Sequence, residues 1–176
     1  MFSILSNLHR QQKMASFYMN FEDMTKFFYG KIIAINESEC AIYMLSPDGN
    51  YDGIVVKSID DVIKIEIDGQ YEEKMKKLML LSSKDRCEEY QLDEDNITKS
   101  LLKYAANAQT IVSIELLHSG NNDVVGNVLA IEDTVCILRN IDAYGNEDGK
   151  TYIRLQDITQ LVCASQDEVR ISRLLK

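Results

Sequence analysis

The chain has 176 residues, 45% of them hydrophobic, a formal net charge of −9 and a sequence pI of about 4.7. The length accommodates two compact units of roughly 80 residues each, near the lower limit for independently stable domains. The acidic charge opposes a broad electrostatic interaction with nucleic acid or an anionic membrane surface. No apolar run approaches the ~20 residues that cross a bilayer, and the apolar start at residues 2–5 is too short for a secretion signal, so we expect a cytoplasmic protein without a membrane partner.

In the first half, the pattern predicts a helix, five strands and a second helix. Ile4, Leu5 and Leu8 recur at helical spacing. A later helix begins at Tyr71, where the helical period returns and brings Met75 onto its apolar face. Between the helices, β-branched, aromatic and other apolar residues predict strands over 14–18, 28–35, 40–45, 54–57 and 62–67.

The second half repeats this order after a charged segment, residues 83–96, which we interpret as an acidic linker between units at 1–82 and 97–176. Asp95 and Asn96 are candidate caps of a helix that contains Leu101 and Ala105. Ile171 then belongs to a closing helix. The strands of this half are expected over 110–114, 124–131, 136–141, 151–154 and 158–163.

The two halves also match residue by residue. A shift of 96 positions (126 minus 30) places Gly30 on Gly126 and Cys40 on Cys136 without a gap. Each copy would need its own folding information, so the match predicts one small domain made twice. Five short strands expose fewer edges when they close, which favours a small barrel in each copy.

A repeated Gly-Asn-x-Asp-Gly sequence follows the third expected strand of each half. We interpret it as a hairpin turn because Gly and Asn adopt positive φ at little cost. Residues 48–53 also resemble the start of a calcium-binding loop, but its twelfth position is Ile59 and the second copy begins with Tyr144, so we expect no metal. The turn residues are Gly49, Asn50, Asp52, Gly53, Gly145, Asn146, Asp148 and Gly149.

No familiar catalytic constellation is visible in the sequence. Of the four cysteines, none forms a CxxC pair, and we expect Cys40 and Cys136 to be buried thiols. His9 and His118 have no partner at ligand or catalytic spacing, and we expect both at the surface. The chain lacks a phosphate-binding loop and a nucleophile elbow, so an enzyme would need a site assembled from distant residues. We therefore expect a protein without catalytic residues or a cofactor.

The segment from Gly30 to Cys40 resembles the Sm1 pattern of the Sm-like family, and Gly126 to Cys136 resembles it again. In the second copy, Arg154 matches the arginine of the Sm2 pattern, with Leu155 where that family has glycine. The resemblance implies a protein that is mainly β with flanking helices (α+β). Its architecture would be two tandem Sm-like five-stranded small barrels, each with an N-terminal and a C-terminal helix.

The resemblance also implies where RNA would bind, but most of the family's contact residues are replaced. The base-binding asparagine is Cys40 or Cys136 here, and the stacking position is Ser38 or Thr134, which offer no π-face. The positions that could contact RNA or another ligand are Ser38, Cys40, Lys57, Ser58, Thr134, Cys136 and Arg154. We therefore favour a non-enzymatic binding or assembly module that self-associates as a dimer or trimer and binds an unidentified protein partner. The alternative is an Sm-like RNA-binding regulator.

Overall fold

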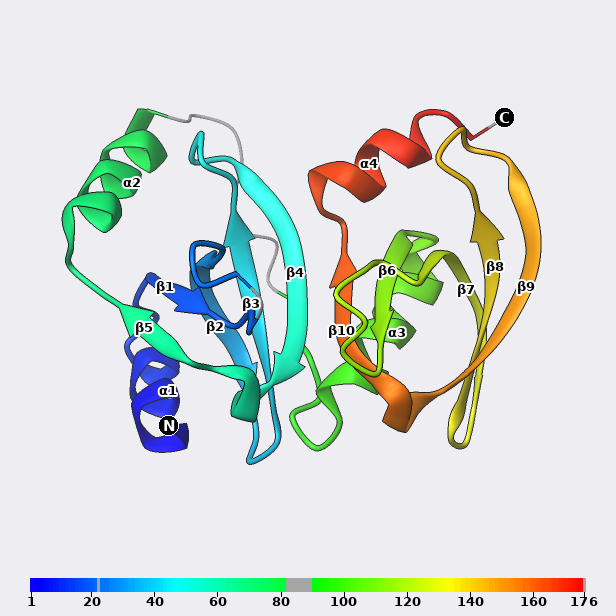
Figure 1. Cartoon of the computed structure of the whole chain (residues 1–176), viewed down its shortest axis with the longest axis horizontal. Helices are drawn as coiled ribbons and strands as arrows, with labels where there is room; N and C mark the ends of the chain where they lie inside the picture. Colours follow the sequence, from blue (N-terminus) through cyan, green and yellow to red (C-terminus); the bar gives the residue numbers. More distant parts are fainter. Residues whose placement is uncertain (22, 82–89, 176) are drawn as a thin grey trace.

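The computed structural model describes residues 1–21, 23–81 and 90–175, and over these residues the protein is mostly β (Figure 1). No helix in this part of the chain has the length and apolarity needed to cross a membrane. The helices are α1 (Phe2–Arg10), α2 (Gln70–Leu81), α3 (Ile97–Ala108) and α4 (Gln166–Ser172). The strands of the first half are β1 (Ala15–Tyr18), β2 (Phe28–Ile35), β3 (Glu39–Leu45), β4 (Tyr51–Ser58) and β5 (Lys64–Glu66). Those of the second half are β6 (Ile111–Leu116), β7 (Val124–Glu132), β8 (Val135–Ile141), β9 (Glu147–Arg154) and β10 (Ile158–Cys163).

All of these strands belong to one antiparallel sheet. Its order is β5-β1-β2-β3-β4-β10-β6-β7-β8-β9, so β4 of the first half pairs with β10 of the second. Figure 1 shows β5 near one side of the molecule and β9 at the other, with β4 and β10 side by side at the centre. The expectation of two separate five-stranded barrels is therefore wrong. The physical reason is that the strand edges are covered by pairing between the halves, not by closure within each half.

The junction between the halves has an apolar core. β4 carries the run Ile54-Val55-Val56, which lies opposite Leu161, Val162 and Cys163 of β10. Ile54 and Val56 pack in a cluster with Leu101 of α3 and Leu161, whereas Val55 faces the core of the first half. Because β4 is covered on both faces, it reads as a continuous apolar run and not as an alternating strand.

The two halves share the same strand order, but their first strands are not in the expected register. Ala15 pairs with Gly30, whereas Val112 pairs with Gly126. The shift between these strands is 97 positions (112 minus 15), against 96 for the strands that follow. The connection from the first to the second strand is thus one residue longer in the first half. Both glycines allow close approach of strands, since a Cβ would lie 2.0 Å from the Tyr43 or Arg139 carbonyl oxygen.

A buried hydrogen bond joins the first strand to the last helix in each half. Ser16 on β1 donates to Glu72 of α2, and Ser113 on β6 donates to Glu168 of α4 at 2.5 Å. The second carboxylate oxygen accepts a backbone N–H just before the helix, from Gly69 at 2.9 Å or from Ser165 at 2.7 Å. Both glutamates are 2% exposed. These links fix each closing helix against the sheet.

The second half is also attached through the start of α3. Glu39 on β3 accepts hydrogen bonds from the Thr98 hydroxyl at 2.5 Å and the Ile97 backbone at 3.2 Å. Asn96 caps the same helix by accepting from the Lys99 N–H at 2.9 Å. The expected linker 83–96 falls partly outside the described residues, and in its described part Tyr90 and Leu92 pack against the core.

Candidate functional site

A cavity of 870 Å³ lies over the junction of the two halves. Its floor is a row of polar residues across three neighbouring strands: Lys57 of β4, Gln160 of β10 and Glu115 of β6. One wall comes from the β1–β2 connection and contributes Phe21, and the other comes from the β6–β7 connection and contributes His118. The pairing of β4 with β10 therefore assembles this site from both halves.

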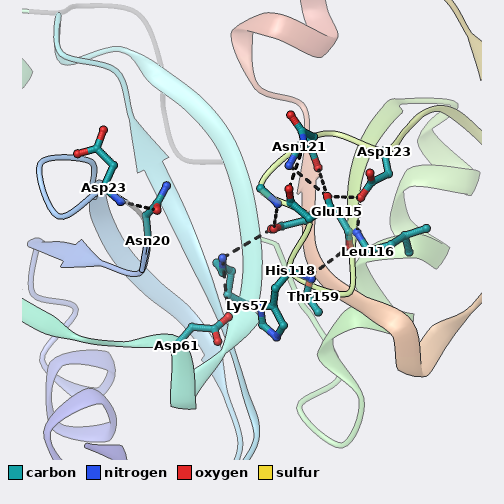
Figure 2. Close-up of polar contacts among 12 residues, drawn as sticks. Asn20, Asp23, Lys57, Asp61, Glu115, Leu116, His118, Asn121, Asp123 and Thr159 are labelled. Atoms are coloured by element: carbon teal, nitrogen blue, oxygen red, sulfur yellow. Dashed lines mark hydrogen bonds and ion pairs between the residues drawn. The ribbon is translucent and has the colours of Figure 1, made fainter.

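Lys57 and Glu115 on the cavity floor form a buried charge cluster with Asp61 (Figure 2). The Lys57 Nζ atom lies 3.7 Å from Asp61 Oδ2 and 3.8 Å from Glu115 Oε2. Lys57 is 8% exposed, Asp61 5% and Glu115 6%. Lys57 Nζ therefore lies between two carboxylates, where it can donate hydrogen bonds to a group in the cavity.

Burial dominates the electrostatics of Asp61. Desolvation raises the pKa of its carboxyl group, which the nearby positive charge of Lys57 and, more weakly, His118 partly offsets. Asp61 Oδ2 also makes no hydrogen bond within the described parts of the chain. The cluster thus holds a carboxylate that is paired with a charge but is not fully satisfied.

The walls of the cavity are held by local hydrogen bonds. Glu115 Oε1 accepts from the Gly120 N–H at 2.9 Å, and Asp123 accepts from the Leu116 N–H at 2.7 Å and the Ser119 hydroxyl at 2.6 Å (Figure 2). These bonds to its charged form lower the pKa of Asp123. On the opposite wall, Asn20 Oδ1 accepts from the Asp23 N–H at 2.9 Å. These hydrogen bonds hold the described residues of both connections in place.

The residues suggested by the Sm-like resemblance lie apart from this cavity, except for Lys57. Backbone hydrogen bonds bring Ser38 beside Ile59 at 3.0 Å and Thr134 beside Leu155 at 2.8 Å, so each stands close to the end of the fourth strand of its half. Ser58 caps the following turn, where its hydroxyl accepts from the Asp60 N–H.

The other three positions offer little to a polar ligand. Cys40 and Cys136 are completely buried, and desolvation raises the pKa of these thiols to about 12 and about 11. Arg154 forms an ion pair with Asp157 at 2.6 Å.

The repeated Gly-Asn-x-Asp-Gly residues straddle the turn and the strand after it. Gly49 and Gly145 have φ of +81° and +78° between the third and fourth strands. The backbone closes there, with the Ser46 N–H donating to Asn50 and the Asp142 N–H to Asn146. Asp52, Gly53, Asp148 and Gly149 already lie within β4 or β9.

Sequence reasoning missed the charge cluster as a unit. Lys57 and Asp61 are four residues apart, and Glu115 is the one charged residue of β6, so each was visible singly. Their approach depends on the pairing of β4 with β10, which brings together residues far apart in the chain. Within the described residues, no group of three or more His, Cys, Asp or Glu side chains is arranged to hold a metal ion. Comparison of the chain with family models, curated proteins and solved structures found no match.

Proposed function

We propose that the protein is a non-enzymatic assembly module whose chains associate head to tail, with β9 of one chain pairing with β5 of the next. The observation that supports this is the order of the sheet. Its two free edges, β9 and β5, are the counterparts of β4 and β10, the strands that pair inside the chain. Unpaired edges carry backbone groups that can pair with another strand. Duplication of one Sm-like unit would account for this repeated order.

The outer face of β9 is the counterpart of a packed surface. Tyr152 occupies the position of Val56 (152 minus 96), yet it is 68% exposed whereas Val56 is 2% exposed. On β8, Ile137 is half-buried at the position of the completely buried Ala41. This face therefore retains apolar side chains that lack the cover found at the junction.

Helix α1 supplies the complementary surface. Leu8 precedes Ala15 by seven residues and Ala105 precedes Val112 by seven residues, so α1 and α3 are related by the shift of 97. Ile4 then corresponds to Leu101, which is completely buried against the other half, whereas Ile4 is 55% exposed. In the proposed contact, Ile4 of the chain that supplies β5 would cover Tyr152 of the chain that supplies β9.

A head-to-tail contact repeats until the chains form a ring or a filament. We propose a closed dimer or trimer of a cytoplasmic protein, in keeping with the free thiols of Cys40, Cys136 and Cys163. Light scattering after size exclusion should then give two or three times the 20.1 kDa of one chain.

Two variants test the proposal in combination. Tyr152→Lys blocks the β9 face and Ile4→Lys blocks the α1 face, so each variant alone should be a monomer. Mixed in equal amounts, they should form a dimer, since each chain still has one intact surface. A contact that uses the same patch on both chains would not be restored by mixing.

Tyr144→Lys is the matched control, because Tyr144 is 79% exposed in the β8–β9 turn, outside the proposed contact. It should self-associate like the unaltered protein. A strict monomer for the unaltered chain, or variants that stay monomeric when mixed, would rule out head-to-tail assembly. Tight binding of oligo-uridine that is lost in Arg154→Ala would instead favour the RNA-binding alternative.

A further inference from the structure

Two polar atoms on the cavity floor lack hydrogen-bond partners among the described residues. They are Lys57 Nζ and Glu115 Oε2, which lie 3.8 Å apart, beyond hydrogen-bond length. Both side chains are more than nine-tenths buried, and both residues line the cavity. The other oxygen of Glu115 is already held by the Gly120 N–H, so Oε2 remains as the available acceptor. Both atoms are held only in ion pairs longer than a hydrogen bond, so each can still bond a molecule that enters the cavity.

The charges beside these two atoms restrict which ligand fits. A carboxylate or phosphate that accepts from Lys57 would lie next to the carboxylate of Glu115. An amine that donates to Glu115 would lie next to the Lys57 Nζ atom. An uncharged group that offers one acceptor and one donor fits this site without either repulsion.

We propose that the cavity binds a small uncharged ligand with an amide-like edge, whose C=O accepts from Lys57 and whose N–H donates to Glu115. In a lactam or a carboxamide these atoms are joined through one carbon, a spacing that bridges two protein atoms 3.8 Å apart with hydrogen bonds of about 2.8–3.0 Å. The proposal does not depend on self-association.

The walls indicate the shape of the rest of the ligand. Met19 and Phe28 line the cavity from the first half, and Phe21, 64% exposed, stands at its rim. Aromatic and thioether side chains pack well against a flat apolar body. The volume of 870 Å³ lies within the range of about 300–1,000 Å³ that is usual for small-molecule sites. A flat heterocycle with a lactam edge matches these features.

A pair of probe compounds tests the proposal on the unaltered protein. 2-Pyridone has the lactam N–H and C=O, whereas N-methyl-2-pyridone keeps the ring and the C=O but lacks the donor. Titration of 2-pyridone, followed by NMR of backbone amides, should give saturable shifts centred on Lys57, Glu115 and Gln160. So small a fragment should bind with a Kd on the order of 1 mM. The N-methyl compound should bind at least about tenfold more weakly, because Glu115 would lose its donor.

Variants then assign the two hydrogen bonds. Glu115→Gln keeps the size and can still accept from Gly120, but it presents an NH₂ group to the ligand N–H and should weaken 2-pyridone at least about tenfold. Lys57→Met removes the other bond and should do the same, whereas Lys103→Met, on the exposed surface of α3, should have no effect. Absence of saturable shifts with 2-pyridone, shifts centred elsewhere, or equal binding of both compounds would overturn the proposal. If Lys57→Met does not fold, the two-compound comparison still decides.

Discussion

Strands β4 and β9 occupy equivalent positions in the two halves and have very different surroundings. In β4, Ile54 and Val55 are completely buried, because one face packs on its own half and the other on the second half. In β9, the counterparts Lys150 and Thr151 are exposed and partly exposed, at the free edge of the sheet. The comparison shows that the side chains of a repeated strand are apolar where another element covers its outer face and polar where none does. The backbone arrangement is the same in both strands.

The largest expected difference concerns a buried charge. Val56→Lys would place an unpaired ammonium in the junction core and should lower the free energy of unfolding by about 4 kcal/mol or prevent folding. The equivalent Tyr152→Lys should change the stability of a single chain by about 0.5 kcal/mol or less, since its side chain already meets solvent. Urea unfolding measures both.

Val56→Ala keeps this comparison informative if Val56→Lys does not fold. It removes two methyl groups from the junction and should cost roughly 2 kcal/mol. Equal losses for Val56→Lys and Tyr152→Lys would show that β4 and β10 are not packed as described.

The two buried Ser–Glu links have the same partners in both halves, so their loss should lower the stability equally. In this they differ from β4 and β9, whose surroundings are unlike. Glu72→Ala and Glu168→Ala each remove a charged acceptor that holds a serine hydroxyl and a backbone N–H, so each should lower the free energy of unfolding by about 3 kcal/mol. Glu73→Ala, on the exposed face of α2, is the control and should cost no more than about 0.5 kcal/mol. A loss below 1 kcal/mol in only one half would mean that the repeated link does not have the same role in both.

The equivalent cysteines should differ in reactivity. Desolvation raises the pKa of Cys40 to about 12 and that of Cys136 to about 11. The reactive thiolate should therefore be scarcer for Cys40 at pH 8, and Cys40 should be alkylated more slowly. Mass spectrometry after brief labelling of the native protein measures the two rates. Faster labelling of Cys40 would contradict the stronger desolvation of its thiol.

The smallest expected effect depends on pH. Desolvation raises the pKa of Asp61 above its ordinary value of 3.8, so the folded state binds this proton more tightly than the unfolded state. Stability from this group is therefore present below about pH 4 and is lost as the pH rises through the raised pKa. Asp61→Asn leaves Lys57 paired with Glu115, and its stability relative to the unaltered protein should be greater at pH 7 than at pH 4.

Asp157→Asn provides the comparison for that prediction in the other half. Its partner Arg154 is largely exposed, so loss of this pair should cost roughly 0–1 kcal/mol. If the relative stability of Asp61→Asn does not rise with pH, the desolvation of Asp61 is not the governing effect.

Much of the local structure could be predicted from the sequence. The expected strand at 28–35 coincides with β2, and that at 158–163 with β10, because β-branched residues and turn residues mark both. The apolar run Ile54-Val55-Val56 is also typical of a strand that is covered on both faces. It did not reveal that β4 pairs with the other half, because a buried strand in an open sheet and a strand in a closed barrel have similar compositions.

The register of the first strand in each half and the cavity could not be predicted from the sequence. The one-residue difference before β2 and β7 lies in a connection, where length is poorly constrained by hydrophobic pattern, so Ala15 was aligned one position away from its true counterpart Val112. The cavity needs Lys57 and Glu115 on either side of β10. Such pairing between distant strands is a property of the tertiary structure and leaves no local signal.

The pairing of β4 with the last strand has a consequence for the order of events during synthesis. Residues 158–163 leave the ribosome about 105 residues after Ser58 (163 minus 58), which takes roughly 5 to 20 seconds at ordinary rates of translation. Until then, Ile54-Val55-Val56 forms an apolar strand with one open edge, the type of segment that pairs with other nascent chains. The first half is therefore most prone to aggregation, and most in need of a chaperone, before β10 has been synthesised. Slower translation of the second half should increase aggregation.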